Sequence, residues 1–563
     1  MARNVVGTPA VPTLSEAFAD DSGPIDAGAV DAAVLDTAHV GDIHGALGTI
    51  SRGDVALRPG LSAKLKTLLA IVGPGLIVMV GDNDAGAFGT YTQAGQNYGT
   101  HLLWALLLLV PVLYVNQEMV LRLGAVSGVG HARLILERFG KFWGAFSVID
   151  LFILNALTIV TEFIGVTLAV GYLGLPKLPS VAIAAAVVVG AASTGSFRRF
   201  ERVCLTLVAG SFVLVPIYLA VHPPATQMLH NFVVPGLPHG SSLSTVMLLI
   251  IAIVGTTVAP WQLFFQQSYV IDKRITPRFI KYERVDLWIG IVIVVVGAAA
   301  MFGFSDAIFA GRPGFGHFTT AAGVAQGLGQ YVSRTMGDLF AIALLDASII
   351  GAAAVGLATA YAGADVIGVN HSLHRPLSKA KGFYACYAGL MVLAGAVVLT
   401  PGAPLGLLTE GVQTLAGVLL PSATVFLLLL CNDKEVLGPW VNSRKLNVFT
   451  AIVIGVLVVM SVILTASVLF PAVTSAQILA VMATGAGLGV LVGLYVLVKA
   501  RREDQLTVPI EWQKRETWRM PALNRLARPV MSTPRKLGLA VLRGYLVIAF
   551  ALVVVKVVEV AIK

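Results

Sequence analysis

The chain has 563 residues, of which 56% are hydrophobic and only 12% are charged, and its mean hydropathy is +0.83. These proportions exclude a soluble globular domain and indicate a polytopic membrane protein. The formal net charge of +9 does not indicate a nucleic-acid partner, because the basic residues gather in alternate loops, as they do in the cytoplasmic loops of membrane proteins.

Apolar stretches, each long enough to cross the bilayer as a helix, predict about a dozen spans. Residues 1–60 precede them and are expected to form a largely flexible arm, which the loop charges place in the cytoplasm. The sequence of this arm does not predict a signal peptide. The expected spans are 68–92, 101–123, 146–174, 178–195, 202–222, 243–271, 285–310, 337–365, 382–400, 411–431, 447–470 and 474–498.

Two of these spans contain helix-breaking residues. The first contains "GDNDAGAFG" (81–89), and the sixth contains "IVGTTVAPWQLFF" (253–265), in which Pro260 removes a backbone donor. Each broken span opens a block of five, 65–222 and 243–431, so the second block crosses the membrane in the opposite direction. This pattern predicts an inverted repeat with a binding site at the midplane, followed by two additional spans at 447–498. Ordinary Gly and Pro kinks are the simpler alternative.

Asp84 lies at the first break, where a carboxylate near the bilayer centre costs about 2.5 to 3.5 kcal/mol on insertion scales. Such a group usually faces a watery cavity and binds a ligand, and a cation is its natural partner. The unwound backbone frees carbonyl oxygens as further hard ligands. The small residues Ala85, Gly86 and Ala87 leave room for an ion with its water.

Several motifs resemble the NRAMP family of divalent transition-metal transporters. The resemblance implies a LeuT-type fold, all-α and polytopic, and it covers about residues 65–470. The segments that carry it are "DAGAFGTYTQAGQNYG" (84–99), "NQEMVLRLGAVSG" (116–128), "TIVTEFIG" (158–165), "SFRRFE" (196–201), "GTTVAPWQL" (255–263) and "GVQTLAGVLLP" (411–421).

The resemblance also implies a set of metal ligands, from which two positions depart. Asp84, the Thr256 carbonyl and Gln413 match ligands of the family, whereas Ala87 replaces its Asn and Ala259 replaces its Met. Loss of the soft thioether leaves an oxygen-only site. Because Mg²⁺ dehydrates reluctantly and is held through few carboxylates, a widened site of this kind suits a largely hydrated Mg²⁺.

This pattern resembles the NRAMP-related magnesium transporters, a prokaryotic branch of the family. The resemblance implies Mg²⁺ uptake through the cell membrane, with Mn²⁺ as a second substrate and no cofactor. Asp82, Gly86, Pro260 and Trp261 are expected to line the pocket, and Trp261 shapes it, since indole offers only a donor. Asn83 fits a metal ligand and a cap of the broken helix equally well.

Proton coupling in the family is associated with a His on helix six and acidic residues on helix three. Here Trp261 replaces that His, Ile159 replaces the helix-three Asp, and Glu162 is retained. Glu162 is either a proton acceptor or a neutral, hydrogen-bonded structural group. We therefore expect weak or absent proton coupling, with the membrane potential as the driving force.

Three other functions fit less well. A proton-coupled Mn²⁺ or Fe²⁺ symporter of the main NRAMP type is expected to use the missing thioether. A LeuT-type amino-acid symporter would present helix dipoles to a carboxylate, which Asp84 would repel. An enzyme would need a motif such as His-Glu-x-x-His or Gly-x-Ser-x-Gly, and neither occurs.

Residues 499–536 are basic with interleaved Trp and are expected to lie on the anionic cytoplasmic leaflet of the lipid bilayer. The hydrophobic run within 537–563 either crosses the membrane or packs obliquely against the other helices.

Overall fold

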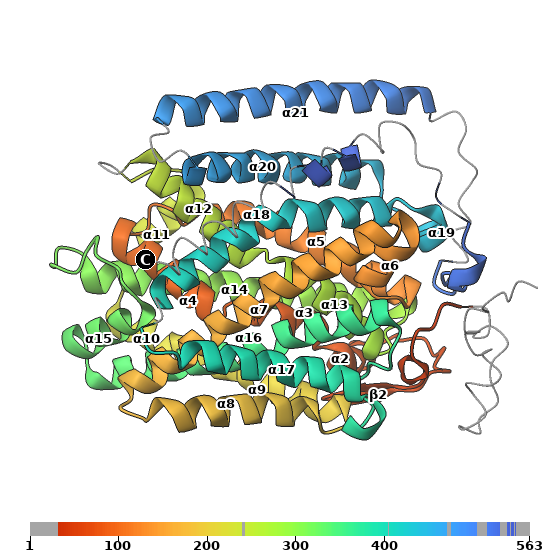
Figure 1. Cartoon of the computed structure of the whole chain (residues 1–563), viewed down its shortest axis with the longest axis horizontal. Coiled ribbons are helices and arrows are strands. Elements are labelled where there is room, and N and C mark those ends of the chain that lie inside the picture. The colour runs from red at the N-terminus through yellow and green to blue at the C-terminus, as the bar shows by residue number, and fades with distance from the viewer. Residues whose placement is uncertain are drawn as a thin grey trace, which may run out of the picture.

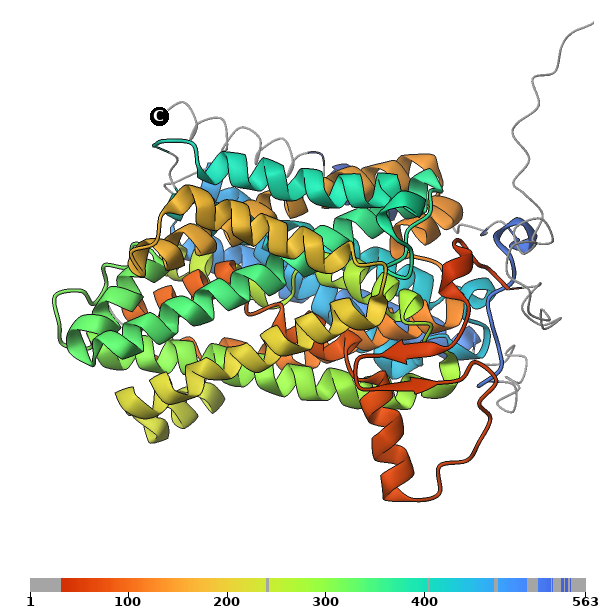
Figure 2. The ribbon, with the colours of Figure 1, turned by 90° about the horizontal axis from the view of Figure 1, so that it is seen from below.

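The computed structural model describes residues 32–238, 242–402, 405–469, 474–503 and 515–527, with a few single residues beyond them. Its long helices run side by side in one bundle (Figures 1 and 2). Within these ranges, nine helices are long and apolar enough to cross a membrane, or ten if the bent pair α2 (Leu61–Ile71) and α3 (Pro74–Val80) forms one span.

The bundle is built from helices close to the expected spans. The long helices after the first break are α5 (Trp104–Ser127), α7 (Lys141–Tyr172), α9 (Phe197–Gly210) with α10 (Leu214–Val221), α14 (Ile280–Phe309), α16 (Arg334–Ile367), α17 (Lys381–Val398), α18 (Leu405–Cys431), α20 (Arg444–Leu469) and α21 (Ser475–Glu503). Shorter helices are α6 (His131–Phe139), α8 (Lys177–Ala192), α11 (Ala225–Val233), α15 (Ala321–Tyr331) and α19 (Lys434–Leu437).

Both expected helix breaks are present. In the first span α3, which ends at Val80, is separated from α4 (Ala85–Tyr98) by four residues. In the sixth, α12 (Leu243–Thr257) is separated from α13 (Pro260–Asp272) by two residues. The half-helix α4 lies at the centre of the bundle, in contact with α7, α12, α14, α16 and α18. A fully enclosed, interrupted helix therefore carries the candidate site.

Residues 36–56, here called the strap, fold against one end of the bundle, which differs from the flexible arm expected for 1–60. Strands β1 (Ile43–Gly45) and β2 (Gly48–Ile50) form an antiparallel hairpin within it. The reason is that basic side chains in distant loops find acceptors on the strap: Arg274 donates to the carbonyls of Ala38 and Asp42. Residues 1–31 lie outside the described residues.

Further contacts tie the strap to α9 and to the loop after α16. Asp36 accepts hydrogen bonds from the Arg375 guanidinium, at 2.6 Å for Nη2, and from the backbone N–H of His371, at 2.9 Å. The Ala46 N–H donates to Glu201 on α9. The strap thereby bridges three segments at one end of the bundle.

Residues 515–527 also pack on this end of the bundle. The Met520 N–H donates to the Val126 carbonyl at 3.2 Å, and the Met520 carbonyl accepts from Ala33. The Trp440 indole donates to the Arg515 carbonyl at 2.7 Å. This part of the basic segment 499–536 thus contacts protein, and its expected contact with lipid stays a prediction; most of 537–563 lies outside the described residues.

His371 gives the strap a pH dependence. Its Nε2 lies 2.8 Å from Asp365 Oδ1. Burial alone would lower the pKa of His371, but the Asp365 carboxylate outweighs burial and raises the pKa to about 9. Protonated His371 therefore forms an ion pair with Asp365 that stabilises the loop to which the strap is bound. Because the folded-state pKa of His371 is raised, the stabilisation from this ion pair is fully present below the unfolded pKa of about 6.5. It is lost as the pH rises through the folded-state pKa.

We therefore expect limited proteolysis within residues 36–56 to become faster between pH 6.5 and about 9. Asp365 on α16 is the main cause of the raised pKa of His371 and Asp36 of the strap is a smaller one, so the population of the released strap should change by less than about tenfold per pH unit. The variant His371→Gln should remove this pH dependence when cleavage is followed by mass spectrometry. Cleavage rates of the native protein that do not change over this range would contradict the prediction.

Candidate metal site

Asp84 caps the helix that follows the first break. Its backbone is extended, and its Oδ1 accepts a hydrogen bond from the Ala87 N–H at 2.8 Å, in the first turn of α4. The positive end of the α4 dipole favours a negative charge at this position. Asp84 is buried, and no Lys, Arg or His within the described residues forms an ion pair with it. Its charge is therefore available to a cation.

The Gln413 amide of α18 lies against the same turn of α4. A Cβ added at Gly86 would collide with the Gln413 amide and would lie 3.2 Å from Asp84 Oδ1. Only glycine permits this approach. The Gln413 Nε2 is buried and has no hydrogen-bond partner within the described residues. Since an amide presents oxygen or nitrogen according to its rotation, Gln413 can offer its oxygen to an ion beside Asp84.

The second break presents backbone oxygen. The carbonyl of Thr256 would accept from residue 260 in a continuous helix, but Pro260 has no N–H to donate. The Thr256 hydroxyl is also buried and has no partner within the described residues. A Cβ added at Gly255 would collide with the Gln413 carbonyl, so α12 and α18 approach closely here. Thr256 thus lies on a helix that packs closely against the one that carries Gln413.

The two alanine positions are buried and offer only methyl groups. Ala87 lies in the first turn of α4, and Ala259 lies in the break before α13. Trp261 is also buried: its indole lies against Gly81 of the first break and edge-on to the Phe265 ring, with centroids 6.1 Å apart. Trp261 thus fills space next to the first break, and its role in shaping the pocket stays a prediction.

Glu162 of α7 lies beside Asp84. Its Oε2 accepts the Ala85 N–H at 3.2 Å, and its Oε1 is buried without a partner within the described residues. A Cβ added at Gly351 of α16 would lie 2.6 Å from Glu162 Oε2 and 3.0 Å from the Cβ of Asp84. The two carboxyl groups thus meet where α4, α7 and α16 pack together, an arrangement that can hold a cation or a proton.

Asn83 and Asp82 lie in the unwound segment before Asp84. The Asn83 amide donates to the Val294 carbonyl of α14 at 3.2 Å, while its Oδ1 is buried without a described partner. This contact anchors the break to α14. The Asp82 carboxylate accepts a hydrogen bond from Gln262 of α13.

The sequence analysis did not single out Gln262 or Gly351. A polar Gln two residues after Pro260, within an apolar span, is a signal that could have identified Gln262. No feature of the sequence around Gly351 marks it as a functional position.

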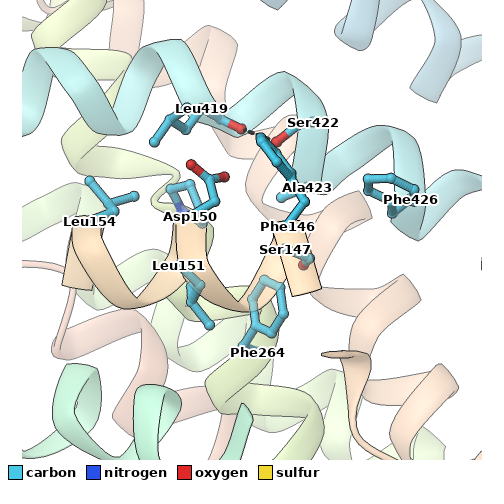
Figure 3. A pocket seen from close by; sticks show the side chains of 11 residues that line it. Phe146, Ser147, Asp150, Leu151, Leu154, Phe264, Leu419, Ser422, Ala423 and Phe426 are labelled. Atoms are coloured by element: carbon cyan, nitrogen blue, oxygen red, sulfur yellow. Dashed lines mark hydrogen bonds between the residues drawn. The ribbon is translucent and has the colours of Figure 1, made fainter. Parts of the chain in front are cut away.

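A separate pocket of about 20 Å³ lies between α7, α18 and the start of α13 (Figure 3). Asp150, Ser147 and Ser422 line it together with mainly apolar side chains. Its volume holds about one water molecule. Pro260 contributes to its wall, but Asp84 does not, so this pocket is distinct from the candidate metal site. Within the described part of the chain, no three His, Cys, Asp or Glu residues are grouped to hold a metal ion.

The family model for natural resistance-associated macrophage protein-like proteins, named Nramp, matches residues 75–467. The chain belongs to the Nramp family. Among similar Nramp-family proteins, the divalent metal cation transporter MntH of Lacticaseibacillus casei is 26% identical over 427 residues, which cover 72% of this chain and 90% of that protein. MntH of Bacillus subtilis is 26% identical over 435 residues, 73% of this chain and 95% of that protein.

A solved structure supports the same assignment at the level of the fold. A manganese transporter of Eremococcus coleocola, in mutant form, matches with a TM-score of 0.60 and 18% identity, over 82% of this chain and 98% of that one. The LeuT-type fold predicted from the sequence is therefore confirmed, with broken helices in the first and sixth spans and additional helices α20 and α21 after the second block.

Proposed function

We propose that this Nramp-family chain is a divalent metal cation transporter that imports Mg²⁺ as a largely hydrated ion, with Mn²⁺ as a second substrate. One observation carries the proposal. Asp84 lies at one helix break beside the Gln413 amide, the Thr256 carbonyl is freed at the other break, and Ala87 and Ala259 present only methyl groups. These donors are hard oxygen ligands without a thioether, and such ligands suit Mg²⁺.

The relatives support the broader part of this proposal. The proteins of L. casei and B. subtilis carry the name divalent metal cation transporter, and the E. coleocola neighbour is named a manganese transporter. The preference for Mg²⁺ rests instead on Ala87 and Ala259, which stand where the resemblance implies an Asn and a Met as metal ligands and have smaller side chains. A wide site lets the ion keep most of its water, which Mg²⁺ gives up reluctantly.

Import is proposed to be weakly coupled to protons or not at all. Of the positions that the resemblance associates with proton transfer, Trp261 and Ile159 cannot titrate, and Glu162 alone can. A divalent ion gains about 4.6 kcal/mol per 100 mV of membrane potential, which supports an accumulation of roughly a thousandfold without a co-transported proton. The unpaired Oε1 of Glu162 beside Asp84 is the one feature that favours the proton-coupled alternative.

The test is metal uptake into proteoliposomes that hold an inside-negative potential and contain a metal indicator and a pH dye. We expect Mg²⁺ to enter, Mn²⁺ to follow, and the internal pH to stay constant. Collapse of the potential should slow Mg²⁺ entry, and protein-free liposomes provide the control. Entry of Mn²⁺ and Cd²⁺ with acidification, and no entry of Mg²⁺, would refute this proposal and favour the proton-coupled symporter.

A further inference from the structure

We propose that Asp82 is a second cation-binding carboxylate, and that with Gln262 and Gln117 it forms a subsite that receives the divalent cation leaving Asp84. The proposal rests on the proposed transport function and adds a binding step to it. Asp82 follows the end of α3, whereas Gln262 lies on α13 and Gln117 on α5. The half-helices α3 and α13 lie between the two breaks and the loops that the charges assign to the cytoplasm. The subsite, at their inner ends, therefore lies on the exit side of Asp84.

The first observation is an unsatisfied carboxylate. Asp82 is fully buried, its Oδ1 accepts the Gln262 amide, and its Oδ2 has no hydrogen-bond partner within the described residues. No basic side chain within the described residues forms an ion pair with Asp82. A buried polar atom without a partner costs about 1 to 3 kcal/mol, and more when it is charged. A cation that reaches this oxygen removes that cost.

The second observation is a chain of buried amides that begins at Asp82. The Gln117 Nε2 donates to the Gln262 Oε1 at 3.0 Å, and the Gln117 Oε1 is buried without a described partner. All three side chains are fully buried. One carboxylate and two amides thus supply oxygen ligands, which are the groups that hard divalent cations prefer.

The polar surface continues along α13. Gln266 lies one helical turn after Gln262 on the same face, and it too is fully buried. Neither its Oε1 nor its Nε2 has a partner within the described residues. Buried amide atoms without partners, on Gln117 and Gln266, are costly in a closed structure, but water and a hydrated ion satisfy them when this side of the bundle opens.

The close spacing of the two carboxylates favours transfer of an ion between them. Asp82 and Asp84 are two residues apart across the unwound segment, and neither has a basic partner within the described residues. Two like charges in a region of low dielectric repel each other, and a divalent cation near either one lowers the energy of both. An ion bound at Asp84 therefore meets a second attractive oxygen as it moves towards α13, and it need not leave in a single step.

The experiment compares Asp82→Asn and Asp84→Asn with the native protein, measuring Mg²⁺ binding by calorimetry and Mg²⁺ flux in proteoliposomes. Asn retains the oxygen that accepts from Gln262 and removes the charge. We expect Asp82→Asn to keep Mg²⁺ affinity within about threefold and to lower flux at least about tenfold, since the first binding site remains. Asp82→Glu should recover part of the flux. Asp150→Asn, at the pocket of Figure 3, is the matched control and should transport normally.

Native-like flux in Asp82→Asn would overturn the proposal. Loss of binding together with flux would also overturn it, because Asp82 would then belong to the Asp84 site or to the folding of the break; thermal unfolding of the variant separates these two causes. If the native protein carries Mn²⁺ but no Mg²⁺, the proposed Mg²⁺ import fails, and the same comparison made with Mn²⁺ still tests Asp82.

Discussion

Asp84→Asn should abolish Mg²⁺ uptake, lowering the flux at least about a hundredfold, which corresponds to about 2.7 kcal/mol. The substitution removes the charge from the first binding site and leaves an amide of the same shape. Asn also caps helices well, so its side-chain oxygen can still accept the Ala87 N–H that Asp84 accepts at 2.8 Å. The fold should therefore survive while the binding site loses its charge.

The measurement is Mg²⁺ flux and Mg²⁺ binding in the same preparations, with thermal unfolding as a check of folding. Asp150→Asn again serves as the matched control, because it neutralises a carboxyl group in the separate pocket between α7 and α18. If Asp84→Asn carried Mg²⁺ at the native rate, neither the metal site nor the subsite at Asp82 would stand as described.

Lys273→Met should destabilise the protein by about 3 to 5 kcal/mol, the usual result of stranding one partner of a buried ion pair. Lys273 is fully buried at the end of α13, and its Nζ lies 2.6 Å from Glu201 Oε1 on α9. The same ammonium donates to the carbonyls of Ile71 and Val72, at 2.6 and 2.8 Å. Its removal leaves the Glu201 charge, and two backbone acceptors, buried without compensation.

Thermal and denaturant unfolding in detergent would measure this loss. The double variant Lys273→Met with Glu201→Gln should recover much of it, because no net charge is then stranded. Arg334→Met is a suitable contrast, because the contacts of Arg334 with Asp338 and Tyr172 are largely exposed. Their loss should change stability by about 1 kcal/mol or less. Equal losses for Lys273→Met and Arg334→Met would contradict the argument.

The unwound segments were the most predictable part of the site. Pro260 withholds a donor from Thr256 in any helical context, and Gly, Asp and Asn in "GDNDAGAFG" interrupt an apolar span whatever surrounds it. The count of spans was less predictable. Apolar length alone predicts about a dozen spans. The first of them is divided between α3 and α4, and α8 has only 16 residues. Neither is therefore a single helix that is long enough to cross a membrane.

The amino-acid sequence by itself determined that the chain is a membrane bundle, where two of its helices break, and which polar residues lie at the breaks, because hydrophobic length and backbone chemistry are local properties. Only the tertiary structure decided which of those residues meet. Gln262 reaches Asp82 from 180 positions away, and Gln117 reaches Gln262 from 145. The ordered fold of the strap likewise depends on tertiary contacts, since Arg274 and Arg375 bind it from loops that are distant in the sequence. Such contacts have no periodicity in the sequence, because they depend on how separate helices pack.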